Sequence, residues 1–476
     1  MKVLITGATG MIGCYVGKLL HQSGHDLVVI SRRSPNDTQM HVPFPCDVIT
    51  ADLGQSPIRN SLLEEVEYII NLTGESIVGS LWTPSYKRRL EASRVVTTRN
   101  LFQSFALLSK RNLKGYIGAS AIGFYGNSFQ EQDEQAEASD GFLSQLVQKW
   151  EDSHMLFKDL LPQQRVAVLR LGVVLGYPGG IHERVIPLLK MGLGSVLGSG
   201  KQWMSWVDLR DVGRFVLWLL ERTSPWSPIY NVTSPNPVTH CQWLEQLTQS
   251  VRGRMIPFNT PSWFLKAILR EQSELLLGSQ RVLPQRALAE GFRFHYERLE
   301  QSLAFLNELF AQTTHLFWAE QFLPKKKEEV FPFFQNAKNL EQITPDFLHF
   351  KILKQSTALI QEGTEFHYTI TLFGIPLKWK TLILDWDPPH RFSDLQVQGP
   401  YKRWYHQHIF NEVPGGVIMN DRVFYELPLE PVGHIGYPWV RQTINKIFQF
   451  RRRKIFELFA DDHTPVDLGK MRQKGL

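Results

Sequence analysis

Three glycines that follow the first strand-like segment constrain the fold of this chain more than any other feature. Residues 3–6 are strand-like, and Gly7, Gly10 and Gly13 come directly after them, at the start of a helical pattern that runs to about residue 24. Glycines at this spacing permit a tight turn and let the backbone approach a pyrophosphate, which then lies at the positive N-terminal end of the helix. The residues predicted to form this nucleotide-binding turn are Gly7, Thr9, Gly10, Met11, Ile12 and Gly13.

Short apolar runs alternate with helical patterns through the first third of the chain. The strand-like runs are residues 3–6, 27–30, 68–72, 115–117 and 166–171. Alternation of this kind is typical of a parallel sheet covered by helices. The runs at 27–30 and 166–169 are continuously apolar, as parallel strands buried on both faces require. We therefore predict an α/β fold with a Rossmann-type, doubly wound parallel sheet.

The end of the second predicted strand indicates which dinucleotide is bound. An acidic residue there would accept a hydrogen bond from the ribose 2′-hydroxyl of NAD. Here Ile30 is followed by Ser31, Arg32 and Arg33, three residues whose side chains can donate to a 2′-phosphate. Arginines in a surface loop are also explained by solvation alone, so the missing acid is the stronger evidence. The predicted cofactor is NADP.

The pattern changes near Ala311, where we place a domain boundary. An amphipathic stretch at residues 328–334 is followed by period-two segments at 365–372 and 417–424, which predict an antiparallel sheet. A long helical pattern then extends from about residue 439 to residue 460. Residues 461–476 have little to bury and are expected to be a loose tail. The second domain is thus predicted to be of the α+β class.

Several motifs of the first 305 residues resemble one known family. They are residues 71–77, 81–84, 93–94, 120–126, 171–175, 198–207, 231–238 and 280–284. Together they resemble the atypical extended short-chain dehydrogenases, the epimerase-family proteins described as nucleoside-diphosphate-sugar epimerase-like. The resemblance implies an NADP-binding domain over residues 1–311, with a small substrate lobe mainly after Val174 and a C-terminal family segment at about residues 250–305.

The same resemblance suggests further binding residues. It implies that Asp52 and Leu53 lie at the edge of the adenine. It places the end of the fourth strand beside the cofactor, at Asn71, Leu72, Thr73 and Gly74. Gln202 and Trp203, after a glycine-rich loop, are the candidates for substrate binding.

The usual catalytic residues of extended short-chain dehydrogenases are incomplete in this chain. Such enzymes use a Ser or Thr and a Tyr-x-x-x-Lys pair, in which the lysine lowers the pKa of the tyrosine. Ser120 fits the first role, but no tyrosine occurs between Gly126 and Gly176. Leu143 or Gln145 stands at the expected tyrosine position, and Lys149 has no tyrosine four residues before it.

Two catalytic candidates remain. One is Ser120, whose alternative role is a hydroxyl that caps a strand end. The other is Tyr125, whose alternatives are packing and substrate contact. Neither candidate restores the Tyr-x-x-x-Lys pair.

The second domain, residues 312–460, is similar to the START-like helix-grip fold of the polyketide cyclase and coenzyme Q-binding superfamily. Its order of elements and the segments 385–392 and 399–404 carry this similarity. The resemblance implies a cavity between a curved sheet and a long helix, suited to a hydrophobic ligand. His390, His406 and His408 are spaced unlike a metal site, so we predict no bound metal.

Composition limits the remaining function classes. A chain of 476 residues with net charge +6 is a folded, multidomain protein, and its densest basic run, residues 451–454, predicts a solvated helix face and no nucleic-acid partner. No apolar run reaches the roughly 18 residues needed to span a bilayer, and the chain opens on a strand instead of a leader. Three dispersed cysteines, Cys14, Cys46 and Cys241, are expected to be reduced. We therefore expect a cytoplasmic protein with no integral membrane segment.

Two functions of different classes follow from these observations. The first is an NADP-dependent oxidoreductase or epimerase-like enzyme that acts on a small, apolar substrate and carries a fused domain for a hydrophobic ligand. The second is a non-catalytic NADP-binding regulator or hydrophobic-ligand carrier, which the missing Tyr-x-x-x-Lys pair favours. The sequence leaves room for a homodimer in either case.

Overall fold

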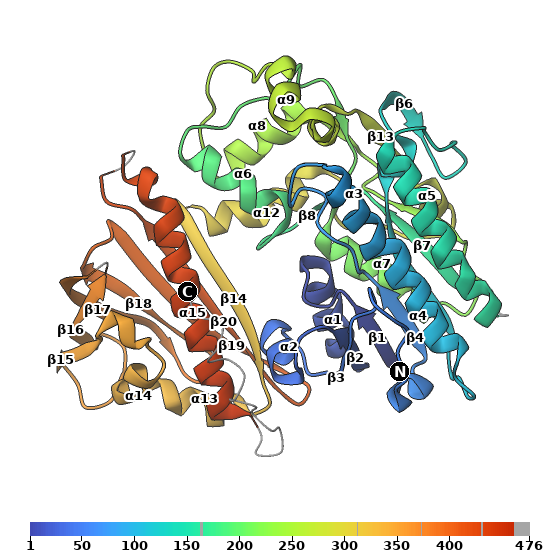
Figure 1. Cartoon of the computed structure of the whole chain (residues 1–476). Coiled ribbons are helices and arrows are strands. Elements are labelled where there is room, and N and C mark those ends of the chain that lie inside the picture. The colour runs from blue at the N-terminus through green and yellow to red at the C-terminus, as the bar shows by residue number, and fades with distance from the viewer. Residues whose placement is uncertain (162–164, 312, 373, 430–431, 461–476) are drawn as a thin grey trace. The chain divides into compact units, whose positions relative to one another are not determined.

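The computed structural model describes residues 1–161, 165–311, 313–372, 374–429 and 432–460, which form two compact units (Figure 1). The first unit contains residues 1–34 and 46–311. The second contains residues 35–45 together with the described residues from 313 onward. The sequence-based division into 1–311 and 312–460 did not separate the segment 35–45. The predicted tail, residues 461–476, lies outside the described residues.

A seven-stranded sheet forms the centre of the first unit, with the strand order β11-β7-β5-β4-β1-β2-β3. All neighbouring strands in this sheet are parallel. The strands are β1 (Lys2–Thr6), β2 (Asp26–Ser31), β3 (Asp47–Thr50), β4 (Tyr68–Asn71), β5 (Gly115–Ala121), β7 (Val166–Leu171) and β11 (Ile229–Val232). Strand β7 is buried along its whole length, because helices cover both faces of a parallel sheet. The predicted Rossmann-type sheet is confirmed.

The strand order reverses between β1 and β4, and this reversal determines where a ligand can bind. Strands β2 and β3 extend the sheet on one side of β1, and the chain then crosses to β4 on the other side. In open parallel sheets, ligands bind beyond the carboxyl ends of the strands at such a switch point. The predicted glycine turn follows β1 at this edge.

Helices pack on this sheet through apolar side chains. They are α1 (Met11–Gln22), α3 (Pro84–Glu91), the π-helical turn η2 (Ala92–Val96), α4 (Thr97–Ala106), α5 (Phe142–Met155) and α7 (Leu209–Glu221). Helix α4 contributes Leu101 and Phe105 to a core that includes Leu4 of β1 and Tyr116 of β5. The apolar face of α4 therefore meets apolar strands that were predicted from the sequence.

Short paired strands and further helices complete the first unit, mostly after β7. The strand pairs are β8 (Val173–Leu175) with β10 (Trp206–Asp208), β9 (Trp203–Met204) with β12 (Val238–Thr239), and β6 (Ser128–Gln132) with β13 (Gln280–Val282). The helices are α6 (Gly180–Lys190), α8 (His240–Ser250), α9 (Ser262–Leu269), α10 (Glu274–Leu277), α11 (Gln285–Ala289) and α12 (Leu299–Leu309).

A buried polar network ties neighbouring strands of the parallel sheet to α5. Thr6 Oγ1 donates to Asn71 Oδ1 at 2.7 Å, and Asn71 Nδ2 donates to the hydroxyl of Tyr116 at 3.0 Å. The Tyr116 hydroxyl in turn lies 2.5 Å from Nδ1 of His154 on α5. Burial lowers the pKa of His154 to about 3, so this imidazole is neutral at neutral pH. The network satisfies polar groups that would otherwise be costly inside the core.

The second unit is built on a seven-stranded antiparallel sheet with the order β14-β20-β19-β18-β17-β16-β15. Its strands are β14 (His315–Leu323), β15 (Lys351–Gln355), β16 (Glu365–Leu372), β17 (Ile375–Asp387), β18 (Arg391–Gln398), β19 (Arg403–Val413) and β20 (Gly416–Glu426). The period-two segments at 365–372 and 417–424 lie in β16 and β20. The predicted antiparallel sheet is confirmed.

One long helix packs on the sheet of the second unit. The helices of this unit are α2 (Pro35–His41), α13 (Lys327–Phe334), α14 (Ala337–Gln342) and α15 (Tyr437–Phe459). Ile444 and Phe448 of α15 pack against Val423 and Tyr425 of β20. Farther along α15, Ile455 joins a second apolar cluster with residues of α13, β18 and β19. The core of this unit therefore lies between the sheet and α15.

The basic run at residues 451–454 lies within α15, as predicted, but it is not a fully solvated face. Arg451 is only 8% exposed, because it faces acidic and imidazole groups inside the unit. In the part of the chain that the structure describes, no helix combines the length and apolar character needed to cross a membrane.

Candidate functional site

The glycine turn after β1 brings three backbone segments into close contact. Gly7 has a φ of +72°, and a Cβ at this position would lie 2.7 Å from the carbonyl oxygen of Leu72. A Cβ on Gly13 would lie 2.3 Å from the carbonyl oxygen of Gly7. Gly10 forms the N-cap of α1 and supplies no side chain to the free N–H groups of the first turn. The helix N-terminus is therefore available for an anionic group such as a pyrophosphate.

The other residues of the turn lie around this helix N-terminus. Thr9 and Gly10 are exposed, and Met11 and Ile12 are half-buried at the start of α1. The sulfur of Met11 packs over Gly179 and Gly180, where added Cβ atoms would lie 3.1 and 3.2 Å from it. Met11 thus packs against the backbone that leads into α6.

Ser31 is the last residue of β2, and Arg32 and Arg33 follow it, so none of the three residues at this position is acidic. Ser31 Oγ accepts a hydrogen bond from the backbone N–H of Arg33 at 3.1 Å, which shapes the turn. The side chains of Arg32 and Arg33 are exposed. A 2′-phosphate at this edge would meet two cationic groups and a hydroxyl, whereas a 2′-hydroxyl would find no carboxylate.

Asp52 and Leu53 have local roles at the end of β3. Asp52 Oδ1 accepts from the N–H of Gly54 at 2.9 Å, so its side chain closes a turn. Leu53 is 6% exposed and packs in the core beneath the sheet. The turn they form follows β3 at the carboxyl edge of the sheet, but only its backbone and Asp52 are accessible from outside.

The segment after β4 contributes mainly backbone to the site. The side-chain amide of Asn71 is occupied by Thr6 and Tyr116, and it is 1% exposed. Its Oδ1 also accepts from the N–H of Thr73 at 3.3 Å. Asn71 therefore holds the loop in place, while Leu72 and Thr73 present main-chain atoms next to Gly7 and Gly74 lies against the guanidinium of Arg94.

Arg94 is a buried cation beside this loop that the sequence reasoning did not assign to the site. It lies in the π-helical turn η2 and is 9% exposed. Its guanidinium donates to the carbonyl oxygens of Glu75 and Leu90 and to the hydroxyl of Ser93, none of which is a carboxylate. Burial lowers the pKa of Arg94 to about 10, so it remains charged. A guanidinium that bonds only neutral groups is suited to attract an anion.

Ser120 belongs to a buried network that centres on an ion pair. The serine lies at the end of β5 and is 3% exposed, and its hydroxyl donates to Glu151 Oε1 at 2.6 Å. Arg170 of β7 holds the same carboxylate with two hydrogen bonds, each 2.8 Å long. Such a two-pronged contact is the strongest arrangement for this pair of groups. Ser120, Glu151 and Arg170 form what we call the Glu151 network.

Tyr125 extends the Glu151 network to β11. Arg170 Nη1 donates to the Tyr125 hydroxyl at 2.9 Å, and this hydroxyl donates to Asn231 Oδ1 at 2.7 Å. Burial raises the pKa of Tyr125, although the charge of Arg170 and its hydrogen bond act in the opposite direction. The phenol therefore keeps its proton at neutral pH and directs it toward Asn231.

The positions expected for the Tyr-x-x-x-Lys pair serve other purposes. Leu143 packs in an apolar cluster with Trp82 and Leu146. Lys149 Nζ pairs with Glu91 at 3.1 Å, at an exposed position on α5. Glu151, two residues later, is the residue of this helix that meets Ser120. The contact of α5 with Ser120 is therefore made by a carboxylate.

Of the two predicted substrate residues, Gln202 ends the segment between α6 and β9, and Trp203 is the first residue of β9. Gln202 is 6% exposed, and its Nε2 donates to the carbonyl oxygens of Leu197 and Leu276 at 3.0 and 3.1 Å. Trp203 is half-buried, with the guanidinium of Arg281 lying 4.7 Å from its ring centre. Gln202 therefore ties the segment after α6 to helix α10, and Trp203 is the more accessible of the two residues.

Glu151 and Arg170 were missed by the sequence reasoning, although each left a signal. Arg170 is the one charged residue in the otherwise apolar strand 166–171. Glu151 lies next to Trp150 in a helix whose buried residues include Val147 and His154. A charge in such surroundings requires a partner of opposite sign. Pairing the two would have predicted a contact between α5 and β7.

Removal of one charge from this buried pair is expected to destabilise the protein strongly. Arg170→Met leaves the Glu151 carboxylate unpaired in the core, which should lower the free energy of unfolding by about 3–5 kcal/mol. Lys149→Ala removes the ion pair between Lys149 of α5 and Glu91 of α3, whose side chains are 55% and 43% exposed. It should change the free energy of unfolding by less than about 1 kcal/mol. Urea denaturation of both variants measures the difference. Equal losses would contradict the assigned role of the buried pair.

Comparison with known proteins places the first unit in one family. Residues 3–233 match the model of the NAD dependent epimerase/dehydratase family, and residues 260–306 match a domain of unknown function, DUF1731. Epimerase family protein ML0860 of Mycobacterium leprae is 33% identical over 315 residues, which are 64% of this chain and 94% of that protein. Epimerase family protein YfhF of Bacillus subtilis is 32% identical over 306 residues, which are 64% of this chain and 97% of that protein.

A solved structure agrees with this assignment. The crystal structure of human epimerase family protein SDR39U1 (isoform 2) with NADPH has a TM-score of 0.55 and 28% sequence identity to this chain. The match covers 65% of this chain and 99% of that chain. Motifs, strand order and relatives all agree, and the chain belongs to the NAD dependent epimerase/dehydratase family.

Proposed function

We propose that the first unit binds NADP(H) and acts as an oxidoreductase or epimerase-like enzyme on a small molecule. The observation that carries this proposal is the end of β2, where Ser31, Arg32 and Arg33 stand in place of an acidic residue. The uncapped N-terminus of α1 supplies the site for the pyrophosphate. The human relative crystallised with NADPH supports the same choice of cofactor.

The Glu151 network is the proposed source of proton transfer. When bound, NADP(H) supplies or accepts a hydride, so the protein must handle the accompanying proton. Ser120 lies at the carboxyl edge of the sheet, and its proton already points to Glu151 at 2.6 Å. As a substrate hydroxyl passes its proton to Ser120 Oγ, the serine passes its own proton to Glu151. Arg170 holds both oxygens of the Glu151 carboxylate in place for this transfer.

A second candidate function is NADP(H) binding without catalysis. Ser120 and Tyr125 are 3% and 2% exposed, and both hydroxyls donate to acceptors inside the protein. In this alternative the Glu151 network serves stability alone. Bound cofactor then stabilises one conformation of the chain, as in a regulator or a carrier of a hydrophobic ligand.

For the second unit we propose a START-like helix-grip domain that binds a hydrophobic ligand. The order of its elements supports this: β14, α13 and α14, six further antiparallel strands, and then α15. A cavity of about 300 Å³ opens within this unit, within the usual size range of small-molecule sites. Phe347 and Leu372 line it together with Lys446 of α15, a combination that suits an apolar ligand with an acidic head group.

We also propose that the protein works in the cytoplasm. Cys14, Cys46 and Cys241 are far apart in the sequence and form no disulfide within the described residues. Reduced cysteines are typical of proteins in that compartment.

Reversal of charge at the end of β2 is expected to weaken NADPH binding selectively. The double variant Arg32→Glu/Arg33→Glu should raise the Kd for NADPH at least tenfold, because hydrogen bonds to a charged group contribute about 1.5–3 kcal/mol each. The Kd for NADH should change little. Lys110→Glu, in the loop before β5, is the control for a reversal of surface charge. Titration calorimetry measures the Kd of each variant and of the wild type for both dinucleotides. An equal loss for both dinucleotides would contradict recognition of the 2′-phosphate.

Ser120→Ala distinguishes catalysis from binding alone. It should lower kcat for NADPH-dependent reduction of a carbonyl substrate by about 10²–10⁴-fold and leave the Kd for NADPH unchanged. Ser144→Ala is the control, because Ser144 is a buried serine that bonds only the carbonyl oxygen of Phe124 and the amide of Gln148. The assay follows NADPH oxidation across a panel of aldehydes and ketones. If the wild-type protein binds NADPH but oxidises it with none of them, the non-catalytic alternative is favoured.

Lys446→Glu tests the ligand cavity of the second unit. The variant should bind the anionic fluorescent probe cis-parinaric acid roughly tenfold more weakly than the wild type, because its carboxylate replaces the attracting ammonium group. Lys338→Glu, at an exposed position on α14, is the charge-matched control. Fluorescence titration measures the affinity of the wild type and of each variant for the probe. Absence of binding to the wild type, or equal binding by all three proteins, would contradict the proposed cavity.

A further inference from the structure

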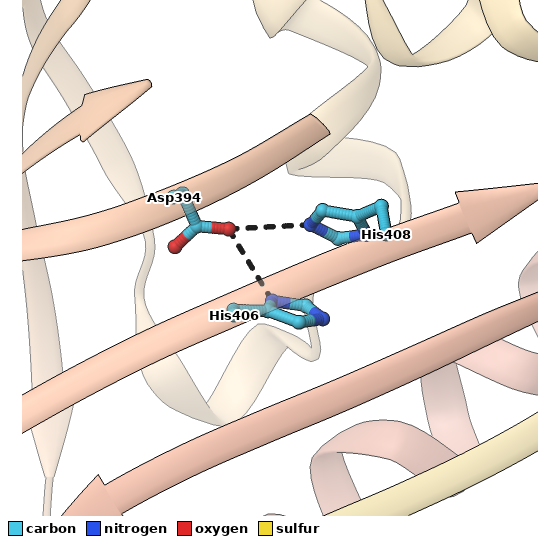
Figure 2. Close-up of side chains that lie close together, drawn as sticks. All are labelled: Asp394, His406 and His408. Atoms are coloured by element: carbon cyan, nitrogen blue, oxygen red, sulfur yellow. Dashed lines mark hydrogen bonds and ion pairs between the residues drawn. The ribbon is translucent and has the colours of Figure 1, made fainter. Parts of the chain in front are cut away.

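Two histidines and an aspartate lie together inside the second unit. His406 and His408 are two residues apart on β19, so the pleat places both side chains on the same face of the sheet. Asp394 on the neighbouring β18 is the register partner of His406. Figure 2 shows one carboxylate oxygen of Asp394 directed toward both imidazoles. Its Oδ2 lies 3.4 Å from His406 Nδ1 and 3.2 Å from His408 Nε2.

These separations are those of ligands around one metal ion. Zinc binds nitrogen and oxygen ligands at about 2.0–2.1 Å, and a tetrahedral arrangement then places two ligand atoms roughly 3.3 Å apart. Both distances from Asp394 Oδ2 agree with that value. The three ligand atoms all lie within 4.8 Å of one another. A small cation could therefore bind all three with only small side-chain movements.

The opposite side of the two imidazoles faces a second carboxylate. Asp421 Oδ1 on β20 lies 2.9 Å from His406 Nε2 and 3.0 Å from His408 Nδ1. All four imidazole nitrogens thus face carboxylate oxygens. Each ring presents one nitrogen to Asp394 and the other to Asp421.

We propose that Asp394, His406 and His408 bind one divalent transition-metal ion of the zinc class. The metal takes the lone pairs of His406 Nδ1 and His408 Nε2, and the two remaining N–H groups donate to Asp421. A carboxylate that orients metal-binding imidazoles from behind is the usual outer arrangement of such sites. The donor set of two imidazoles and one carboxylate suits zinc and related ions and leaves a coordination position for water or a ligand.

Arg451 completes the surroundings of the proposed site. Its Nε lies 3.6 Å from Asp421 Oδ2, so it balances the charge of the outer carboxylate. Its Nη2 also lies 3.2 Å from His408 Nδ1. In the proposed site, His408 Nδ1 carries a proton and donates to Asp421, so this contact with Arg451 is lost. The rings of Phe392 and Phe448 lie 4.3 and 5.3 Å from the centres of His408 and His406. An apolar shell of this kind limits water and strengthens the attraction between the metal and its ligands.

Metal binding by the full-length protein tests the proposal. After treatment with EDTA, the protein is dialysed against Zn²⁺ and the bound metal is measured by mass spectrometry. We expect one equivalent for the wild type and for His390→Ala, a control at an exposed histidine of the same unit. Asp394→Asn, which preserves the side-chain shape, and His406→Ala should bind Zn²⁺ at least tenfold more weakly.

A second measurement remains decisive if a variant folds poorly. Co²⁺ added to the wild type should produce visible absorption bands of a site with nitrogen ligands, and excess Zn²⁺ should remove them. Circular dichroism identifies variants that are not folded. The proposal is overturned if the wild type binds less than one-tenth of an equivalent, because the cluster is then a metal-free ion network. It is equally overturned if folded Asp394→Asn binds Zn²⁺ as tightly as the wild type, because the metal then binds elsewhere.

Discussion

The buried pair of Glu151 and Arg170 is the interaction on which the site of the first unit depends. It joins α5 to β7, and through Ser120 and Tyr125 it reaches β5 and β11. Two charges inside a core are tolerated only when nearly all their hydrogen-bonding capacity is used. Glu151 satisfies this condition with three donors. The same bonds determine where the Ser120 hydroxyl points, so stability and any proton transfer at this site rest on one set of contacts.

The parts of the first unit that could be predicted from the sequence are those governed by neighbours along the chain. A glycine at a positive φ, a continuously apolar strand and a missing acid are local features, and Gly7, β7 and Arg32 follow from them. The Glu151 network could not be predicted in this way, because its members come from four elements far apart in the sequence. The apolar surroundings of Arg170 indicate that it needs a partner, but they do not identify Glu151.

In the second unit, too, the sequence predicts local elements but not the contacts between distant residues. Strands β16 and β20 and helix α15 follow from periodicity, whereas the meeting of Asp394 with His406 depends on the register between β18 and β19, which periodicity does not determine. The prediction of no bound metal considered the histidine spacing along the chain alone, and it stays a prediction. Alternation in a strand places His406 and His408 on one face, and this was the available signal. His390 lies at an exposed turn and takes no part.

The two buried clusters differ in where their positive charge lies. In the Glu151 network, Arg170 meets both oxygens of the carboxylate, and the proton of Tyr125 is directed to Asn231. This ion pair therefore balances without an added ion. In the second unit, Arg451 lies on the Asp421 side of the two imidazoles, with its Nε 3.6 Å from Asp421 Oδ2. Asp394 faces the same imidazoles from the other side, and this is where the metal ion that we propose would bind.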